Sequence, residues 1–397
     1  MRNLYYSFAV ILSLFLFLSC STESTPVYQL SMNTDPAEAG SVSPSSGEFE
    51  EGESVEVRAT ANENWVFDRW QGDLTGNLNP APVILNMDKS ITAVFKKQEY
   101  NLAINVIGEG EIEQRVISTK STPYEHGTTV ELEAIPKFGW EFDKWSGDVN
   151  GNTNPISIRV EDETSVTAEF RTEIVTDIDG NEYETVLIGD QLWLRESLIT
   201  TKYTDGSLIK SNLSALEWEN TNEGAFTIYD HSLVNGIDSE GDMIEKYGVL
   251  YNWYAIQDER KICPEGLDVA DNDDWSELIS FVSESSNESA NSLKTRRQIN
   301  SPLGDPWATE EHPRWDENTE HYGKDEVNFT ALPMGFANEN KIYQRIGESV
   351  NWWSKTPFSA FPSNSVSGVS LISNSGDVRA DLVNRNYGLG VRCVKNN

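Results

Sequence analysis

The chain contains one stretch twice: Trp-Val-Phe-Asp-Arg-Trp-Gln-Gly-Asp at residues 65–73 returns as Trp-Glu-Phe-Asp-Lys-Trp-Ser-Gly-Asp at residues 140–148. The similarity extends, at the same offset of 75, over residues 52–95 and 127–170. Both copies alternate apolar and polar residues between Gly, Asn and Pro, a pattern typical of short strands joined by turns. The sequence therefore predicts two tandem all-β domains.

These two predicted domains, at residues 28–98 and 99–172, are small, and their size decides how their tryptophans are interpreted. An exposed ring could stack on a sugar, but a domain of about 70 residues needs bulky side chains to form a core. The pattern resembles the divergent internalin B-repeat family, found in tandem on bacterial surface proteins, and the resemblance implies a role as spacers. We predict core positions for Trp65, Trp70, Trp140 and Trp145.

The repeats stop near residue 172, and residues 173–397 form a third predicted domain. This domain carries eight of the twelve tryptophans and opens with Asp177-Ile-Asp-Gly-Asn181 between two apolar runs. An Asp-Gly pair in that setting predicts a hairpin. The aspartates could instead begin a calcium loop, but the later oxygen ligands of an EF-hand do not follow. We therefore predict a plain turn.

A helix is predicted from about residue 272 to residue 282. Its apolar residues fall at i, i+3, i+4 and i+7, which places them on one helix face, and Asp271 with Asp274 has the form of a capping box. We expect this helix to lie against the core of the third domain. The apolar positions are Trp275, Leu278, Ile279 and Val282.

Ordered landmarks run through the third domain. They are Asp177-Ile-Asp-Gly-Asn181, Gln191-Leu-Trp193, Thr201-Lys-Tyr203-Thr-Asp205-Gly206, Tyr247-Gly-Val-Leu-Tyr-Asn-Trp-Tyr-Ala255, Cys263-Pro-Glu-Gly266, Ala331-Leu-Pro333, Trp352-Trp353-Ser354 and Gly390-Val-Arg-Cys393-Val394. With them the domain resembles the Fibrobacter succinogenes major paralogous domain, a module of secreted and surface proteins. By analogy the resemblance implies an α+β fold near the C-type lectins and formylglycine-generating enzymes, and it implies that the two cysteines pair.

The third domain also departs from that family. Leu267, Asp268 and Ala270 stand where Trp, His and Pro are common. Any activity that depends on this Trp or His is therefore not expected in this chain.

The first residues predict export. An apolar run from Phe8 to Leu18 ends at Ser19 and Cys20, which resembles the lipobox of bacterial lipoproteins. We predict a signal peptide at residues 1–19, lipidation of Cys20 and a flexible tether at residues 20–27, on the outer membrane or cell surface of a Gram-negative bacterium. An unlipidated signal or a single membrane anchor is the alternative.

Once Cys20 is lipidated, Cys263 and Cys393 are the remaining cysteines of an exported chain. Disulfides are typical of oxidising compartments, and we predict that these two pair. The four histidines show no metal-ligand spacing, so we predict neither a metal site nor a cofactor. They are His126, His231, His312 and His321.

The charge of the chain excludes one class of partner. Sixty-four acidic residues against thirty basic ones give a net charge of −34, which repels nucleic-acid phosphates. The acidic residues are spread over all three predicted domains, as expected of a solvated surface. We therefore predict no nucleic-acid partner.

One long loop is the candidate ligand-binding region. Residues 301–328 are rich in Pro, Gly, Trp and acids, and loops of that length are usually functional or disordered. The tryptophans could offer ring faces to a ligand, or they could anchor the loop and close a sheet. The candidate ligand-binding residues are Trp307, Trp315, Tyr322 and Trp352.

Three function classes compete: a binding module, a structural surface protein and a hydrolytic or oxidative enzyme. No nucleophile with a base and no paired carboxylates in a named motif are visible, so we expect no catalysis. We place binding first and expect the third domain to bind an extracellular polysaccharide or a surface protein. A neutral glycan is the preferred ligand, because an acidic domain repels anionic polymers. The structural role comes second and the enzyme third.

Overall fold

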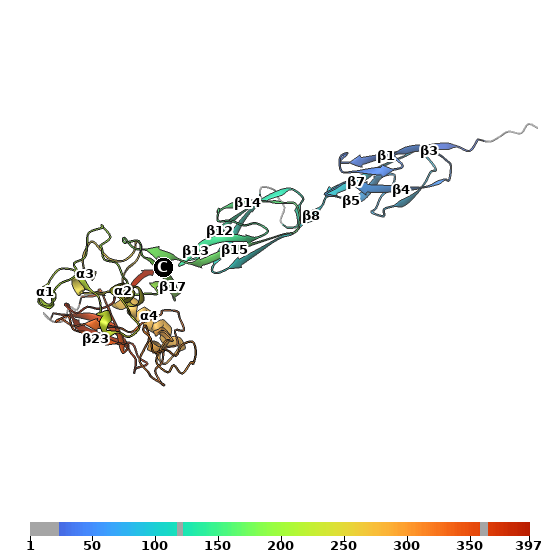
Figure 1. Ribbon diagram of the computed structural model, residues 1–397. Coiled ribbons are helices and arrows are strands. Elements are labelled where there is room, and N and C mark those ends of the chain that lie inside the picture. Colours follow the sequence, from blue (N-terminus) through green and yellow to red (C-terminus); the bar gives the residue numbers. More distant parts are fainter. Residues whose placement is uncertain (1–23, 117–121, 358–363) are drawn as a thin grey trace, which may run out of the picture. The chain divides into compact units, whose positions relative to one another are not determined.

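The computed structural model describes residues 24–116, 122–357 and 364–397 (Figure 1). The predicted signal peptide and Cys20 lie outside the described residues. Contacts divide the described residues into two compact units. The first contains residues 24–103, 114–116, 122–131 and 157–165, and the second contains residues 104–113, 132–156, 166–357 and 364–397. Among the described residues, no helix has the length and apolar character needed to cross a membrane.

The first repeat consists of two mostly antiparallel sheets whose apolar faces pack into a common core, as the alternating pattern predicts. One sheet has the strand order β3-β1-β7-β5 and the other β2-β4-β6. The strands are β1 (Val27–Asp35), β2 (Gly40–Ser43), β3 (Ser46–Glu50), β4 (Ser54–Ala61), β5 (Trp65–Gly72), β6 (Ala81–Ile84) and β7 (Lys89–Lys97).

A β-bulge in β5 explains how Trp70 reaches the core. Side chains alternate between the faces of a strand, so residues three apart would point in opposite directions. The register of β5 against β7 shifts between Phe67 and Arg69, and this extra residue returns Trp70 to the face of Phe67. The rings of Phe67 and Trp70 lie 5.0 Å apart, and the indole Nε1 of Trp70 donates to the carbonyl of Leu78 at 2.8 Å.

The second repeat reproduces these contacts at the predicted offset. The register of β13 shifts between Phe142 and Lys144, and Trp145 donates to the carbonyl of Thr153 at 3.0 Å. Trp70 and Trp145 are buried as predicted, whereas Trp65 and Trp140 are only partly buried. The strands are β8 (Glu99–Tyr100), β9 (Leu102–Ile107), β10 (Gly110–Val116), β11 (Tyr124–Glu125), β12 (Thr128–Pro136), β13 (Trp140–Gly147), β14 (Ile156–Val160) and β15 (Thr164–Thr172).

The C-terminal domain contains two five-stranded sheets, with the orders β16-β17-β18-β27-β21 and β23-β22-β24-β25-β26, and a two-stranded sheet of β19 and β20. The strands are β16 (Ile174–Thr176), β17 (Glu182–Ile188), β18 (Gln191–Leu194), β19 (Phe226–Thr227), β20 (Leu250–Tyr251), β21 (Asp268–Val269), β22 (Met334–Ala337), β23 (Tyr343–Ile346), β24 (Ser349–Trp353), β25 (Ser365–Ile372), β26 (Arg379–Asn384) and β27 (Cys393–Asn396). The helices are α1 (Ala215–Asn220), η1 (His231–Leu233), α2 (Glu240–Tyr247), α3 (Trp253–Ile256), α4 (Asn272–Ser285) and α5 (Ser289–Leu293).

Local signals in the C-terminal domain lead to the elements they predict. Asp177 to Asn181 turns the chain between β16 and β17, which pair antiparallel, and the Asp177 carboxylate accepts hydrogen bonds from the backbone of Asp179 and Asn181. Helix α4 begins directly after Asp271, and the predicted capping box joins Asp271 to Asp274 in the first turn of the helix. Its predicted core face is buried at Trp275, Leu278 and Val282 and half-buried at Ile279.

The predicted disulfide joins Cys263 to Cys393, whose Cα atoms lie 5.9 Å apart. Both cysteines are buried in the same apolar cluster. Cys263 precedes β21, and Cys393 begins β27, to which β21 pairs. The bond therefore holds the end of the chain to a segment 130 residues earlier.

Candidate binding site

Two of the four predicted ligand-binding residues lie in the core, and this part of the prediction was wrong. Trp352 is 0% exposed and stacks on Trp275 with their rings 5.4 Å apart. Trp315 is 1% exposed, and its indole donates to the carbonyl of Ala331. A ring enclosed by protein on both faces cannot stack on a ligand, so these tryptophans fill the core instead.

Trp307 and Tyr322 are half-buried and remain on the surface of the residue 301–328 loop. One cation lies over each ring: the Arg296 guanidinium 5.4 Å from the centre of Trp307, and the Lys324 amine 6.0 Å from that of Tyr322. The loop contains neither helix nor strand, as predicted. The structure thus leaves two of the four predicted residues accessible.

Two buried polar residues around this loop have structural roles. His312 is 7% exposed, and its Nδ1 shares a short hydrogen bond with the Tyr247 hydroxyl. Burial, followed by the nearby Arg314, lowers the pKa of His312 to about 4, so its ring is neutral at physiological pH. The Lys294 amine is also buried and donates to the carbonyls of His321 and Ser375; burial lowers its pKa to about 7.

A different cavity brings aromatic, amide and charged side chains together. We call it the Tyr203 cavity; it has a volume of about 430 Å³. Four separate segments build it: the chain after β18, the loop between α1 and β19, helix α3 and the turn that follows α3. It is lined by Tyr203, Leu208, Lys210, Asn222, Glu223, Gly224, Tyr254, Gln257, Asp258 and Arg260.

The buried amide of Asn252 fixes two of these segments to each other. Its Oδ1 accepts the backbone N–H of Ala255, which caps α3, and also that of Ala225. Its Nδ2 donates to the carbonyl of Glu223 at 2.9 Å. One side chain with no solvent exposure therefore holds the Glu223 loop against the start of α3, and the cavity is preorganised.

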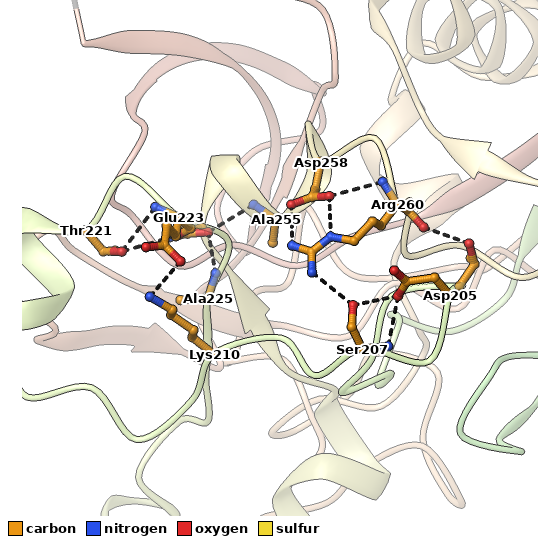
Figure 2. Close-up of polar contacts among 11 residues, drawn as sticks. Asp205, Ser207, Lys210, Thr221, Glu223, Ala225, Ala255, Asp258 and Arg260 are labelled. Carbon is orange, nitrogen blue, oxygen red and sulfur yellow. Dashed lines mark hydrogen bonds and ion pairs between the residues drawn. The ribbon is translucent and has the colours of Figure 1, made fainter.

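Arg260 forms one wall of the cavity, and Figure 2 shows its contacts with Asp258 and Ser207. Its guanidinium binds both oxygens of Asp258, at 2.8 and 2.7 Å, and donates to the Ser207 hydroxyl at 2.9 Å. It also covers the ring of Tyr203, 3.8 Å from the ring centre. These hydrogen bonds from Arg260 keep the pKa of Asp258 below its usual value, so Asp258 is ionised and is not a proton donor near neutral pH.

The opposite charges of the cavity are paired. Lys210 and Glu223 form a second ion pair at 2.6 Å, also drawn in Figure 2. The lining thus contains two cations and two anions and has no net charge, in a chain that is strongly acidic. The amides of Asn222 and Gln257 add donors and acceptors without charge.

Tyr203 is buried behind the accessible lining, with 1% of its surface exposed, and its hydroxyl interacts with the Asp258 carboxylate. Burial, followed by the charge of nearby Asp258, raises the pKa of Tyr203 to about 12, so the hydroxyl keeps its proton. Gly224 leaves room for it, because a Cβ there would lie 1.9 Å from the hydroxyl oxygen.

A smaller cavity of about 220 Å³ has the buried Arg392 in its wall. The guanidinium donates to the carbonyl of Leu194 and packs over the ring of Phe329, and burial lowers the pKa of Arg392 to about 9. These contacts attach the chain before β27 to β18, which is a structural role. The Tyr203 cavity is therefore the better candidate site.

In the sequence, Tyr203 and Tyr254 belong to the landmarks of the family resemblance, and no pattern assigns them to a binding site. The residues of the cavity come from positions between 203 and 260 in four segments, and no spacing rule joins them. Tyrosines between Asp, Asn and Gly are a weak signal of a binding surface. The stronger signal in the sequence, the high density of tryptophan, reflects core packing and not a binding surface.

Comparisons with known proteins agree with this architecture. The model of the family described as Fibrobacter succinogenes major domain matches residues 186–395. That described as Divergent InlB B-repeat domain matches residues 30–99 and 100–174. No curated protein and no solved structure gives a significant match to the chain.

Proposed function

The chain belongs to the family of the Fibrobacter succinogenes major domain, and from this premise we propose that its C-terminal domain binds a neutral extracellular glycan in the Tyr203 cavity. The two divergent InlB B-repeat domains serve as spacers in this proposal. A lipid on Cys20 anchors the chain at the cell surface. The partner is an extracellular polysaccharide, and no cofactor takes part.

The accessible lining of the cavity carries the proposal: a half-buried tyrosine ring, Tyr254, stands beside two amides and two ion pairs. A sugar presents many hydroxyls, each a donor and an acceptor, on rings with apolar faces. The cavity offers the matching groups: two amides, paired charges and the ring of Tyr254. Its zero net charge favours a neutral ligand over a uronic acid or a sulfated sugar.

Binding is preferred over catalysis because the Asp258 carboxylate is held by two hydrogen bonds from Arg260. Glu223 is likewise paired with Lys210. A general acid needs a raised pKa and a free proton, and the pKa of Asp258 is lowered instead.

A structural surface protein without a small ligand is the alternative. Burial of seven of the eight tryptophans of the C-terminal domain supports it, because their number then reflects packing. We also place this domain near the C-type lectins and formylglycine-generating enzymes, on the analogy of sheets with short helices and a long irregular loop. The buried tryptophans are Trp193, Trp218, Trp253, Trp275, Trp315, Trp352 and Trp353.

Tyr254→Ala is expected to weaken glycan binding and to leave the domain folded. Tyr254 is half-buried and lines the cavity, so its truncation should cost less than the roughly 3–5 kcal/mol of a core aromatic residue. A lost ring contact with the ligand is worth about 0.5–1.5 kcal/mol, or up to about tenfold in Kd. A glycan array followed by calorimetry on the best ligand measures the change.

Two tyrosines provide matched controls for that test. Tyr183→Phe removes a hydroxyl that donates to Asp177 and accepts from Ile199, so it should cost about 1–3 kcal/mol of stability without changing Kd. Tyr322→Ala removes a half-buried ring of the residue 301–328 loop. If Tyr322→Ala weakens binding and Tyr254→Ala does not, the site lies on the loop and the Tyr203 cavity is excluded.

The anchor is tested separately. Mass spectrometry of the mature protein should find an N-terminal Cys20 that carries two or three acyl chains, each of which contributes about 0.8 kcal/mol of membrane affinity per buried methylene. An unmodified N-terminus beyond Cys20 would refute lipidation.

A further inference from the structure

We propose that the ligand is an internal segment of a neutral polymer that extends from the Tyr203 cavity into a second cavity beside it. This inference rests on the proposed function and adds the length of ligand that the site accepts. The second cavity, which we call the Lys355 cavity, has a volume of about 340 Å³. It is bounded by Asp268, Val269, Lys355 and Thr356 and by the turn after α3.

The two cavities share a wall. Gln257 and Asp258 line both the Tyr203 cavity and the Lys355 cavity. Gln257 is exposed and Asp258 is half-buried, so the wall is open to solvent. A ligand longer than the first cavity can therefore pass over these two side chains without leaving the protein surface.

The Lys355 cavity also contains ion pairs and an amide, but its lining has two further carboxylates, Glu259 and Asp271. Lys355 pairs with Asp268 at 3.0 Å, and Lys261 approaches the same carboxylate at 3.8 Å. The amide of Gln257 donates to the carbonyl of Lys355 at 2.6 Å, which ties the shared wall to the far side of the second cavity. Val269 and Thr356 add an apolar and a hydroxyl contact. The amide, the apolar side chain and the hydroxyl suit a neutral polyhydroxylated unit, and the excess of carboxylates repels an anionic one.

The turn between the cavities is held in one conformation. The backbone N–H of Arg260 donates to the Asp258 carboxylate, and the backbone N–H of Lys261 donates to the Asp258 carbonyl. Lys261 has a φ of 56°, and Cys263 is fixed by the disulfide. A rigid wall lowers the conformational entropy lost on binding, so adjoining units of one polymer can use both cavities.

A third cavity, of about 490 Å³, adjoins the second at Lys261. It is bounded by Asp177, Ile178, Pro264 and Leu267. Three adjacent cavities around one turn are more than a monosaccharide or a chain end would need.

The test uses the full chain and neutral linear oligosaccharides, from disaccharide to octasaccharide, of the cello-, xylo- and manno- series. We expect the affinity to rise by about tenfold or more between the disaccharide and the octasaccharide. Lys355→Ala should remove most of that gain and leave the disaccharide affinity unchanged, because Lys355 lines only the second of the two binding cavities.

Lys144→Ala is the matched control, since Lys144 forms a comparable surface ion pair with Glu169, 3.4 Å away in the second repeat. This variant should bind every length as the parent does. A longer oligosaccharide also gains affinity because it can bind one site in several registers. The Lys355→Ala variant separates this statistical gain, which it keeps, from the gain due to a second subsite, which it loses. Equal affinity at all lengths, or a gain that survives Lys355→Ala, overturns the inference while the proposed function stands. Absence of binding at every length overturns the proposed function and the inference with it.

Discussion

Trp352→Ala is expected to lower the free energy of unfolding of the C-terminal domain by about 3–5 kcal/mol. Trp352 is fully buried in β24 and contacts the rings of Trp275 and Phe329. The Arg392 guanidinium also lies 5.6 Å from the centre of its ring. Truncation would remove the apolar contacts and leave a cavity that the surrounding sheet cannot fill.

Urea unfolding followed by circular dichroism measures this loss, with Trp307→Ala as the matched control. Trp307 is half-buried on the loop, so its replacement should cost much less. Unchanged unfolding of Trp352→Ala would contradict the assignment of this ring to the core. A loss of glycan affinity in a Trp352→Ala protein that remains fully folded would restore it to the ligand-binding site.

Removal of the disulfide is expected to destabilise the same domain by a similar amount. The bond closes a loop with a sequence separation of 130, and loss of this constraint on the unfolded chain is worth on the order of 4 kcal/mol. Urea unfolding of the double variant Cys263→Ala with Cys393→Ala measures this loss of stability. Alanine is the replacement because both cysteines are buried and small. The described repeats contain no cysteine, so any separate unfolding transition of the repeats should stay in place.

Reductant provides the control for this prediction. It should lower the stability of the parent protein and leave that of the double variant unchanged. Two free thiols in unreduced protein from an oxidising compartment would contradict the bond. Equal stability of the parent and the double variant would contradict its contribution.

Several features of this fold could be predicted because they depend on neighbours in the sequence. The offset of 75 places Trp70 and Trp145 in equivalent core positions, since similar alternating patterns bury similar side chains. Helix α4 begins where Asp271 and Asp274 can cap it. The hairpin at Asp177 and the Cys263–Cys393 bond were also predicted, the first by turn chemistry and the second by counting cysteines.

The exposure of individual aromatic residues could not be predicted in this way. Trp315 and Trp307 stand in one loop with similar neighbours, yet the first is enclosed in the core and the second is half-buried. A side chain is buried by segments that fold over it, and Ala331 and Lys294, which contact Trp315, come from outside the loop. A similar limit applied to Trp65 and Trp140, which are less buried than the repeat pattern suggested.

The sequence by itself determined the two repeats, the capped helix and the cysteine pair, because period, capping and covalent chemistry are properties of short segments or of single residue types. Only the tertiary structure decided the candidate site. Tyr203, Glu223, Tyr254 and Arg260 share one cavity because the Asn252 amide joins two segments and the Arg260 guanidinium joins the others. Such contacts form only when distant parts of the chain pack against each other, and packing is a property of the whole domain.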